Sequence, residues 1–180
     1  NDNWRMYHSS NTAAPETDFM TSNGVFGTED AVDNWNDTAP TSTVFTVNTN
    51  VAVNVDNELY VAYCFHSVDG YSKFGSYYGN GSSNGAFIYT GFRPAFVIIK
   101  AYTTSEPWSI RDSARSPENP ATKVLKPDNP AAEITSASFT VDLLSNGFKC
   151  RGGGAEINDS SHTYIYLAFA ETPFKYANAR

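Results

Sequence analysis

The sequence has few charged residues, few cysteines and no long apolar run. Charged residues make up 17% of the 180 residues, and the formal net charge is -7. An acidic surface argues against a nucleic-acid partner and against binding to an anionic membrane. No apolar run approaches the roughly 20 residues of a membrane-spanning helix, so we expect no membrane insertion. No signal peptide is visible. The chain starts at Asn1 without Met, so we expect an N-terminus that is processed, trimmed or incomplete.

Only two cysteines are present, Cys64 and Cys150. Cys64 falls inside a strand-like stretch and is expected to be buried. Cys150 closes a short predicted strand that follows the turn signal Asn146-Gly147. Two buried free thiols are the expected state. A disulfide would need Cα atoms roughly 4.4–6.8 Å apart, and the sequence leaves that distance open.

The sequence carries no pattern of a catalytic or cofactor site. The three histidines, His8, His66 and His162, lack metal-ligand spacing, and we expect neither a metal nor a cofactor. No Gly-x-Ser-x-Gly elbow and no local Cys/His signature is present. Among 19 acidic residues, some pair can reach the spacing of a glycosidase by chance. We therefore predict no catalytic residues and no enzymatic activity.

Aromatic residues, in contrast, are abundant: 3 Trp, 11 Tyr and 12 Phe. Each ring buries on the order of 150–250 Å² in a core, so burial can stabilise the fold without disulfides. Residues 59–66 and 163–170 are the most strand-like stretches, and Asn-Gly turn signals and prolines separate further short apolar segments. Only residues 28–36 permit a short helix. The pattern predicts an all-β protein, an antiparallel β-sandwich of jelly-roll or concanavalin-like type.

Residues 59–66 are apolar on both alternating faces. Such a segment is typical of a central strand that is covered on both sides. We therefore predict that residues 59–66 form a buried central strand, and that residues 163–170 form its counterpart.

An internal repeat supports this counterpart. Trp4 aligns with Trp108, and Tyr60 aligns with Tyr164 at the same offset, while residues 42–47 align with 136–141. Residues 71–103, which hold three strand-like pieces, have no counterpart ahead of Trp4. We predict two related units, residues 1–70 and 71–180, of which the first lacks its opening strands. These strands are expected upstream in a longer protein, cleaved off, or replaced by another chain.

Five residues are candidates for ligand binding. Asp33 and Asp37 belong to the densest acidic cluster and flank Trp35, which can either stack on a sugar ring or fill the core. The cluster can also be a solvated loop, since its spacing fits no EF-hand. Tyr7 and Arg111 lie on the polar faces of the two tryptophan strands, which suits either solvent or a ligand.

Long motifs give the sequence a family resemblance. They are Trp35-Asn36-Asp37-Thr38-Ala39-Pro40, Tyr89-Thr90-Gly91-Phe92-Arg93-Pro94 and Tyr164-Ile165-Tyr166-Leu167-Ala168-Phe169. With them the chain resembles uncharacterised repeat domains in tail-fibre and appendage proteins of marine tailed bacteriophages. The resemblance implies a β-sandwich component of the virion surface, with host attachment or glycan binding as its role, and it supplies no site residues.

The expected function is therefore that of a non-enzymatic virion structural protein for host-surface attachment or particle decoration. Its expected partners are other virion proteins, further copies of itself, with a trimer favoured, and a host-surface glycan. Two alternatives remain open. One is a carbohydrate-binding module of a secreted protein, and the other is a polysaccharide depolymerase.

Overall fold

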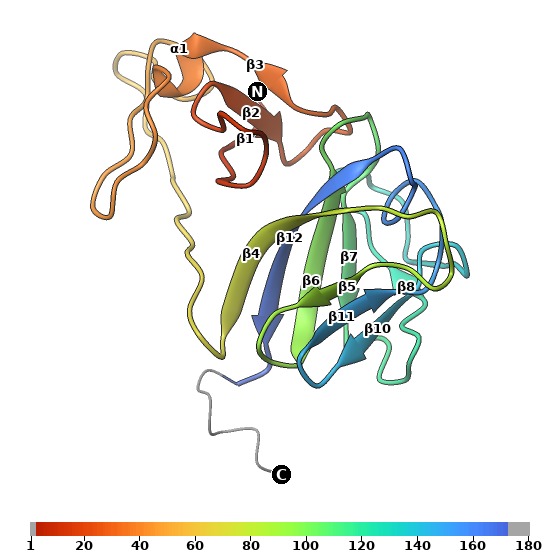
Figure 1. The fold of residues 1–180 in the computed structure, drawn as a ribbon. Coiled ribbons are helices and arrows are strands. Elements are labelled where there is room, and N and C mark those ends of the chain that lie inside the picture. The colour runs from red at the N-terminus through yellow and green to blue at the C-terminus, as the bar shows by residue number, and fades with distance from the viewer. Residues whose placement is uncertain (1–2, 173–180) are drawn as a thin grey trace.

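The computed structural model describes residues 3–172, which form two halves of different shape (Figure 1). The C-terminal half, residues 71–172, holds a four-stranded sheet and a three-stranded sheet. The four-stranded sheet has the order β4-β12-β6-β7, with bounds Ser72–Tyr78, Thr163–Ala170, Pro94–Ala101 and Ser109–Asp112. The three-stranded sheet has the order β10-β11-β5, with bounds Val141–Leu144, Gly147–Cys150 and Phe87–Tyr89.

The remaining elements are short. The N-terminal half, residues 3–70, contains a three-stranded sheet in the order β1-β2-β3 and one helix. Their bounds are Arg5–Met6, Asp18–Thr21 and Glu29–Asp30 for the strands and Val32–Trp35 for α1. In the C-terminal half, β8 (Lys123–Val124) pairs with β9 (Ile134–Thr135). All named strand pairs are antiparallel, and no helix of residues 3–172 is long and apolar enough to span a membrane.

Two packed sheets of the C-terminal half enclose the main core, as the sequence predicts for a β-sandwich. Strand β12 lies between β4 and β6 and pairs with both along its length. Its alternate residues Tyr164, Tyr166 and Ala168 point into the sandwich, where Phe148 of β11 meets them. The mostly β architecture and the antiparallel sheets are therefore confirmed.

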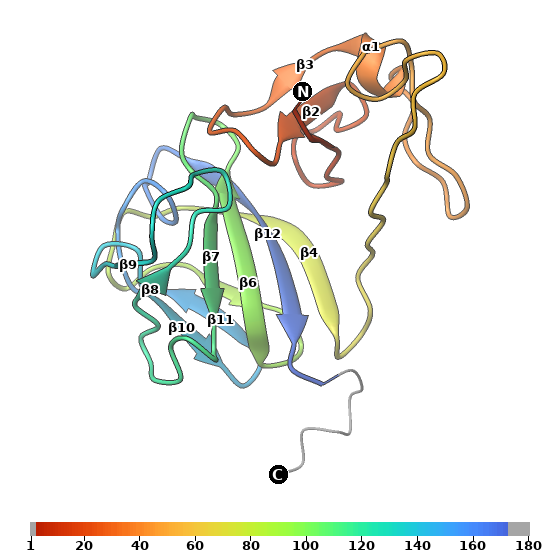
Figure 2. The same cartoon turned by 180° about the vertical axis from the view of Figure 1, so that it is seen from behind.

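The opposite, outer face of the four-stranded sheet is also apolar, and the N-terminal half packs on one end of it. Met20 of β2 is fully buried beside Trp108, Ile165 and Leu167. Two hydrogen bonds join the halves there. Trp108 Nε1 donates to the Thr21 carbonyl at 2.9 Å, and Lys100 Nζ donates to the Val25 carbonyl at 2.8 Å. The same arrangement seen from behind (Figure 2) shows the N-terminal half at one end of the sandwich.

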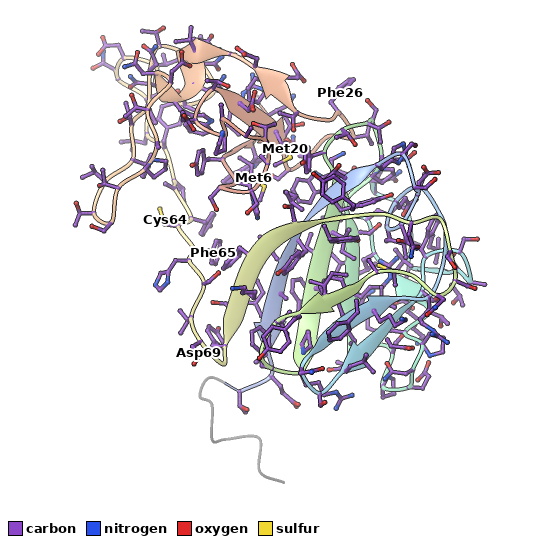
Figure 3. All side chains as sticks on the ribbon, in the orientation of Figure 1. Met6, Met20, Phe26, Cys64, Phe65 and Asp69 are labelled. Atoms are coloured by element: carbon purple, nitrogen blue, oxygen red, sulfur yellow. The ribbon has the colours of Figure 1, made fainter. Side chains whose placement is uncertain are left out.

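The prediction for residues 59–66 is wrong. These residues form an exposed, extended segment that belongs to no strand and runs from the N-terminal half to the turn before β4 (Figures 1 and 3). Cys64 is exposed, not buried, and Leu59 is 98% exposed. The physical reason is that no strand of residues 3–172 pairs with either edge of this segment, whereas both edges of β12 are paired.

The remaining structural predictions are confirmed in part. The single helical turn expected in residues 28–36 is confirmed as α1, and the Asn146-Gly147 turn joins β10 to β11. Residues 42–47, which the repeat aligns with residues 136–141, form no strand. Instead, the Thr41 hydroxyl accepts the backbone N–H groups of Thr43 and Val44 and holds a local turn. Both cysteines are free, and Cys150 is buried.

Some hydrogen bonds nevertheless recur 104 residues apart. The Tyr60 hydroxyl donates to the Val51 carbonyl at 2.8 Å and accepts the Val55 N–H at 2.9 Å. The Tyr164 hydroxyl makes the same two bonds at 2.7 and 2.8 Å, with partners Ala155 and Asp159. The backbone bond from Asn54 to Asn50 likewise has a counterpart from Asn158 to Gly154. The loops before residues 60 and 164 therefore have the same local conformation.

The core assignment can be tested with Phe148→Ala. Phe148 is fully buried between the sheets, and removal of a buried phenyl ring costs about 3–5 kcal/mol. We expect urea unfolding to show a loss of that size in the free energy of unfolding. The matched control is Phe45→Ala. Its ring is 48% exposed, so the change should be within about 0.5 kcal/mol. Equal losses in the two variants would contradict the core assignment.

Candidate functional site

The structure brings four of the five predicted ligand residues together at or next to α1, namely Tyr7, Asp33, Trp35 and Asp37, but Trp35 is a core residue there. Its side chain is buried, and its indole Nε1 donates to the Asp18 carbonyl at 2.9 Å. Tyr7 packs edge-on against it, with ring centroids 6.4 Å apart. Burial, with the nearby Glu16 carboxylate, raises the pKa of Tyr7, so its hydroxyl is neutral. Trp35 thus presents no free ring face to a sugar.

The aspartates of this loop differ from each other. The Asp33 carboxylate accepts hydrogen bonds from the side-chain amides of Asn34 and Asn50 at 3.1 and 2.9 Å. The bond from Asn50 connects the following loop to α1. Asp37 is exposed and has a φ of 44°, next to Asn36 at 55°. Asn and Asp tolerate this left-handed conformation better than other non-glycine residues. In residues 3–172, no three His, Cys, Asp or Glu side chains lie close enough to hold a metal ion.

Arg111 does not join the other predicted residues. It lies on β7, on the inner face of the four-stranded sheet, and it is fully buried. Its guanidinium donates from Nε to the Phe139 carbonyl at 2.9 Å and from Nη1 to the Ile110 carbonyl at 3.1 Å. Burial lowers the pKa of Arg111 to about 10, so it stays charged at neutral pH. Its position supports the sandwich edge and offers no contact to a ligand in solvent.

Beside Arg111 lies a second buried polar group, Glu156. Its carboxylate accepts the Ser109 hydroxyl at 2.9 Å and forms an ion pair with Lys126. Nearby, burial raises the pKa of the Cys150 thiol to about 11, which leaves it protonated and a poor nucleophile at neutral pH. These groups therefore have their polar partners inside the fold.

An apolar cleft lies between the halves. It has a volume of about 470 Å³ and is lined by Trp4, Met6, Ser22, Asn23, Tyr63, Ile98, Trp108, Pro127 and Leu167. Trp4 and Tyr63 stack on each other at its mouth, with ring centroids 6.0 Å apart and an interplanar angle of 29°. Both rings are largely exposed.

The N-terminal strand region fixes the position of this aromatic pair. The Trp4 backbone N–H donates to the Asn23 side-chain oxygen at 3.0 Å, and the Trp4 carbonyl accepts the Ser22 N–H. Figure 3 shows Met6 and Met20 pointing from this region toward the sheet. An apolar cleft with two exposed aromatic faces can hold an apolar side chain, or the flat face of a sugar ring through stacking.

Sequence reasoning missed this cleft. It paired Trp4 with Trp108, and both line the cleft, but it placed Tyr63 in a covered strand. The one signal for the site in the sequence was the alignment of Trp4 with Trp108. No strand of residues 3–172 pairs with the backbone of Tyr63, and its ring is exposed.

Comparisons with known proteins give one result. Residues 1–173 match a family model described as a domain of unknown function, DUF7483. No curated protein and no solved structure gives a significant match.

The buried histidine at the junction of the halves predicts a pH dependence. The His8 ring is buried, and its Nδ1 accepts the Ser10 N–H at 3.1 Å. Burial lowers the pKa of His8 from 6.5 to about 4. The unfolded chain therefore binds more protons between pH 6.5 and 4, and stability is lost as the pH falls through this range. The expected loss is at most about 3 kcal/mol.

His8→Asn keeps an acceptor for the Ser10 N–H and removes the titrating ring. We expect chemical denaturation between pH 7 and 4 to show a flatter stability profile for this variant. The control is His66→Asn at an exposed position, which should leave the profile unchanged. If the wild type and His8→Asn lost stability in parallel, the assignment to His8 would be wrong.

Proposed function

Since the chain belongs to the DUF7483 family, a domain of unknown function, we propose its role from the structure and from its sequence resemblance to phage appendage domains. The proposed role is that of a non-enzymatic structural protein of a bacteriophage virion. It would serve in a tail fibre or surface appendage, for host-surface attachment or particle decoration. Its place would be the outside of the particle.

The observation that carries the proposal is the apolar surface of the N-terminal half. Val44, Val51, Val61, Tyr63 and Phe65 are all more than half exposed. Val61, Tyr63 and Phe65 alternate along one extended segment, and apolar residues gathered on a protein surface mark an interface with another protein. Such a surface suits a subunit of an assembly. Packing against other virion proteins, or a symmetric trimer of this chain, would cover it.

We further propose that the two halves are repeats of one unit, with boundaries at residues 1–70 and 71–180. The support is the register of their small sheets. In β2 and β3, Asp18 faces Asp30 and Phe19 faces Glu29. Each of these residues has a counterpart 105 positions later in β8 and β9, with pairs Lys123–Thr135 and Val124–Ile134. The jelly-roll or concanavalin-like arrangement of the complete unit stays a prediction.

The first test is the location of the protein. Density-gradient purified particles of the phage that encodes the chain should contain its peptides by mass spectrometry. Antibodies against residues 1–180 should label an appendage in immunogold electron microscopy. As a control, a cytoplasmic phage enzyme from the same lysate should be absent from these particles. Particles that are infectious and lack the protein would refute the virion role.

A second function, glycan binding, has its own support in the Trp4–Tyr63 stack at the cleft mouth. Exposed aromatic faces bind sugar rings by stacking. On an array of bacterial surface glycans, the wild type should then bind a subset, and Trp4→Ala and Tyr63→Ala should each reduce binding at least about tenfold, which corresponds to about 1.4 kcal/mol.

The matched control for the array is Tyr89→Ala, an exposed tyrosine on the edge strand β5 away from the cleft. Binding that survives both cleft variants would place the glycan elsewhere. Release of reducing sugar from the bound polysaccharide would instead support the depolymerase alternative.

A further inference from the structure

The exposed segment at residues 59–66 resembles β12 in sequence but is not paired as a strand. At an offset of 104 residues, Val61 corresponds to Ile165, and Phe65 to Phe169. Val61 is 66% exposed, whereas Ile165 is fully buried. The two segments start from loops with the same hydrogen bonds at Tyr60 and Tyr164. The two segments thus have similar sequences and similar preceding loops. Residues 59–66 have ring contacts through Tyr63 and Phe65 but no strand paired with either edge.

In the C-terminal half, residues 71–103 supply the paired strands. They contain β4 and β6, which pair with the two edges of β12. They also supply polar contacts to Asn158, whose side-chain amide donates to Asn80 and to the Ser82 carbonyl at 3.0 and 2.8 Å. Asn158 is fully buried by these contacts, whereas its counterpart Asn54 is exposed.

We propose that residues 59–66 are the docking site for a polypeptide segment of the type of residues 71–103, joined directly ahead of Trp4. This segment would add one strand to each edge of residues 59–66 and make them the centre of a second sheet of β4-β12-β6-β7 type. The inference rests on the proposed repeat and does not depend on the virion role. The proposal concerns only the two edges of residues 59–66. In the repeat alignment, residues 48–49 stand where the C-terminal half has residues 142–153, so the N-terminal half has no counterpart of β11.

The C-terminal half also indicates where the segment is joined. Strand β6 ends at Ala101 and β7 begins at Ser109, and the two pair as neighbours. In the proposed repeat, β1 corresponds to β7. The added strand that corresponds to β6 would therefore end a few residues ahead of Trp4. A second copy of this chain is a poor source of the missing strands, since its own β4 and β6 are paired with its own β12.

The test prefixes a copy of residues 71–104 to the full chain, ahead of Asn1. Four residues then lie between the copied Thr103 and Trp4. The same number separates Thr103 from Trp108 in the C-terminal half. In the 180-residue chain, the backbone amides of residues 59–66 should exchange with solvent at nearly the rate of an unfolded peptide. In the prefixed chain, exchange of these amides should slow at least about 100-fold, as in a paired strand.

Two controls make the result specific. In the first, the copied segment carries Val97→Pro and Ile99→Pro, which remove ladder hydrogen bonds from a central strand, and the protection of residues 59–66 should be lost. In the second, Asn54→Ala should have no effect on exchange in the 180-residue chain and should weaken protection in the prefixed chain. Exchange in β12 should be unchanged throughout, which shows that the C-terminal half stays folded.

Three outcomes would overturn the proposal. Protection of residues 59–66 in the dilute 180-residue chain would mean that the segment is already paired within it. Protection that rises with the concentration of that chain would make a second copy the occupant. Equal exchange with the normal and the proline-containing prefix would show that residues of this type do not dock. None of these measurements involves virions or glycans, so failure here bears on the proposed repeat and leaves the proposed virion role and glycan binding standing.

Discussion

A strand that is apolar on both faces is stable only when other strands pair with both of its edges. In this protein β12 meets that condition through β4 and β6. Its inner residues then close the sandwich core, and its outer residues form the surface on which the N-terminal half packs through Met20. The backbone groups of a buried strand cannot be left without partners at low cost. The two ladders of β12 therefore support the core, the junction of the halves and the floor of the cleft.

This condition also separates what the sequence could predict from what it could not. Strand β12, the Asn146-Gly147 turn and the helical turn α1 follow from local composition, and the structure confirms them. Residues 59–66 are similarly rich in aromatic and aliphatic residues and were predicted in the same way, but wrongly. Local pattern shows which faces a strand is able to bury. It does not show whether neighbouring strands are present to pair with its edges.

The candidate site was harder to predict, because it depends on which side of a strand becomes the inside. Arg111 alternates with apolar residues in a way that suits a solvent face, yet this face of β7 turns into the sandwich, where backbone carbonyls satisfy the guanidinium. Trp35 was open to two interpretations, and the hydrogen bond to the Asp18 carbonyl favours the core one. The cleft unites Trp4 with Tyr63 and Leu167, which are far apart in sequence, so no local motif encodes it.

Docking of strands at residues 59–66 and ligand binding at the cleft are compatible with each other. Leu167, the counterpart of Tyr63, lies on the outer face of its sheet beside Trp108, while β4 and β6 pair with the edges of β12. Edge strands added to residues 59–66 would by the same geometry fix the backbone of Tyr63 and leave its ring on the outer face beside Trp4. An ordered aromatic platform loses less conformational entropy on binding than a mobile one. Completion of the sheet would therefore strengthen recognition at the Trp4–Tyr63 pair.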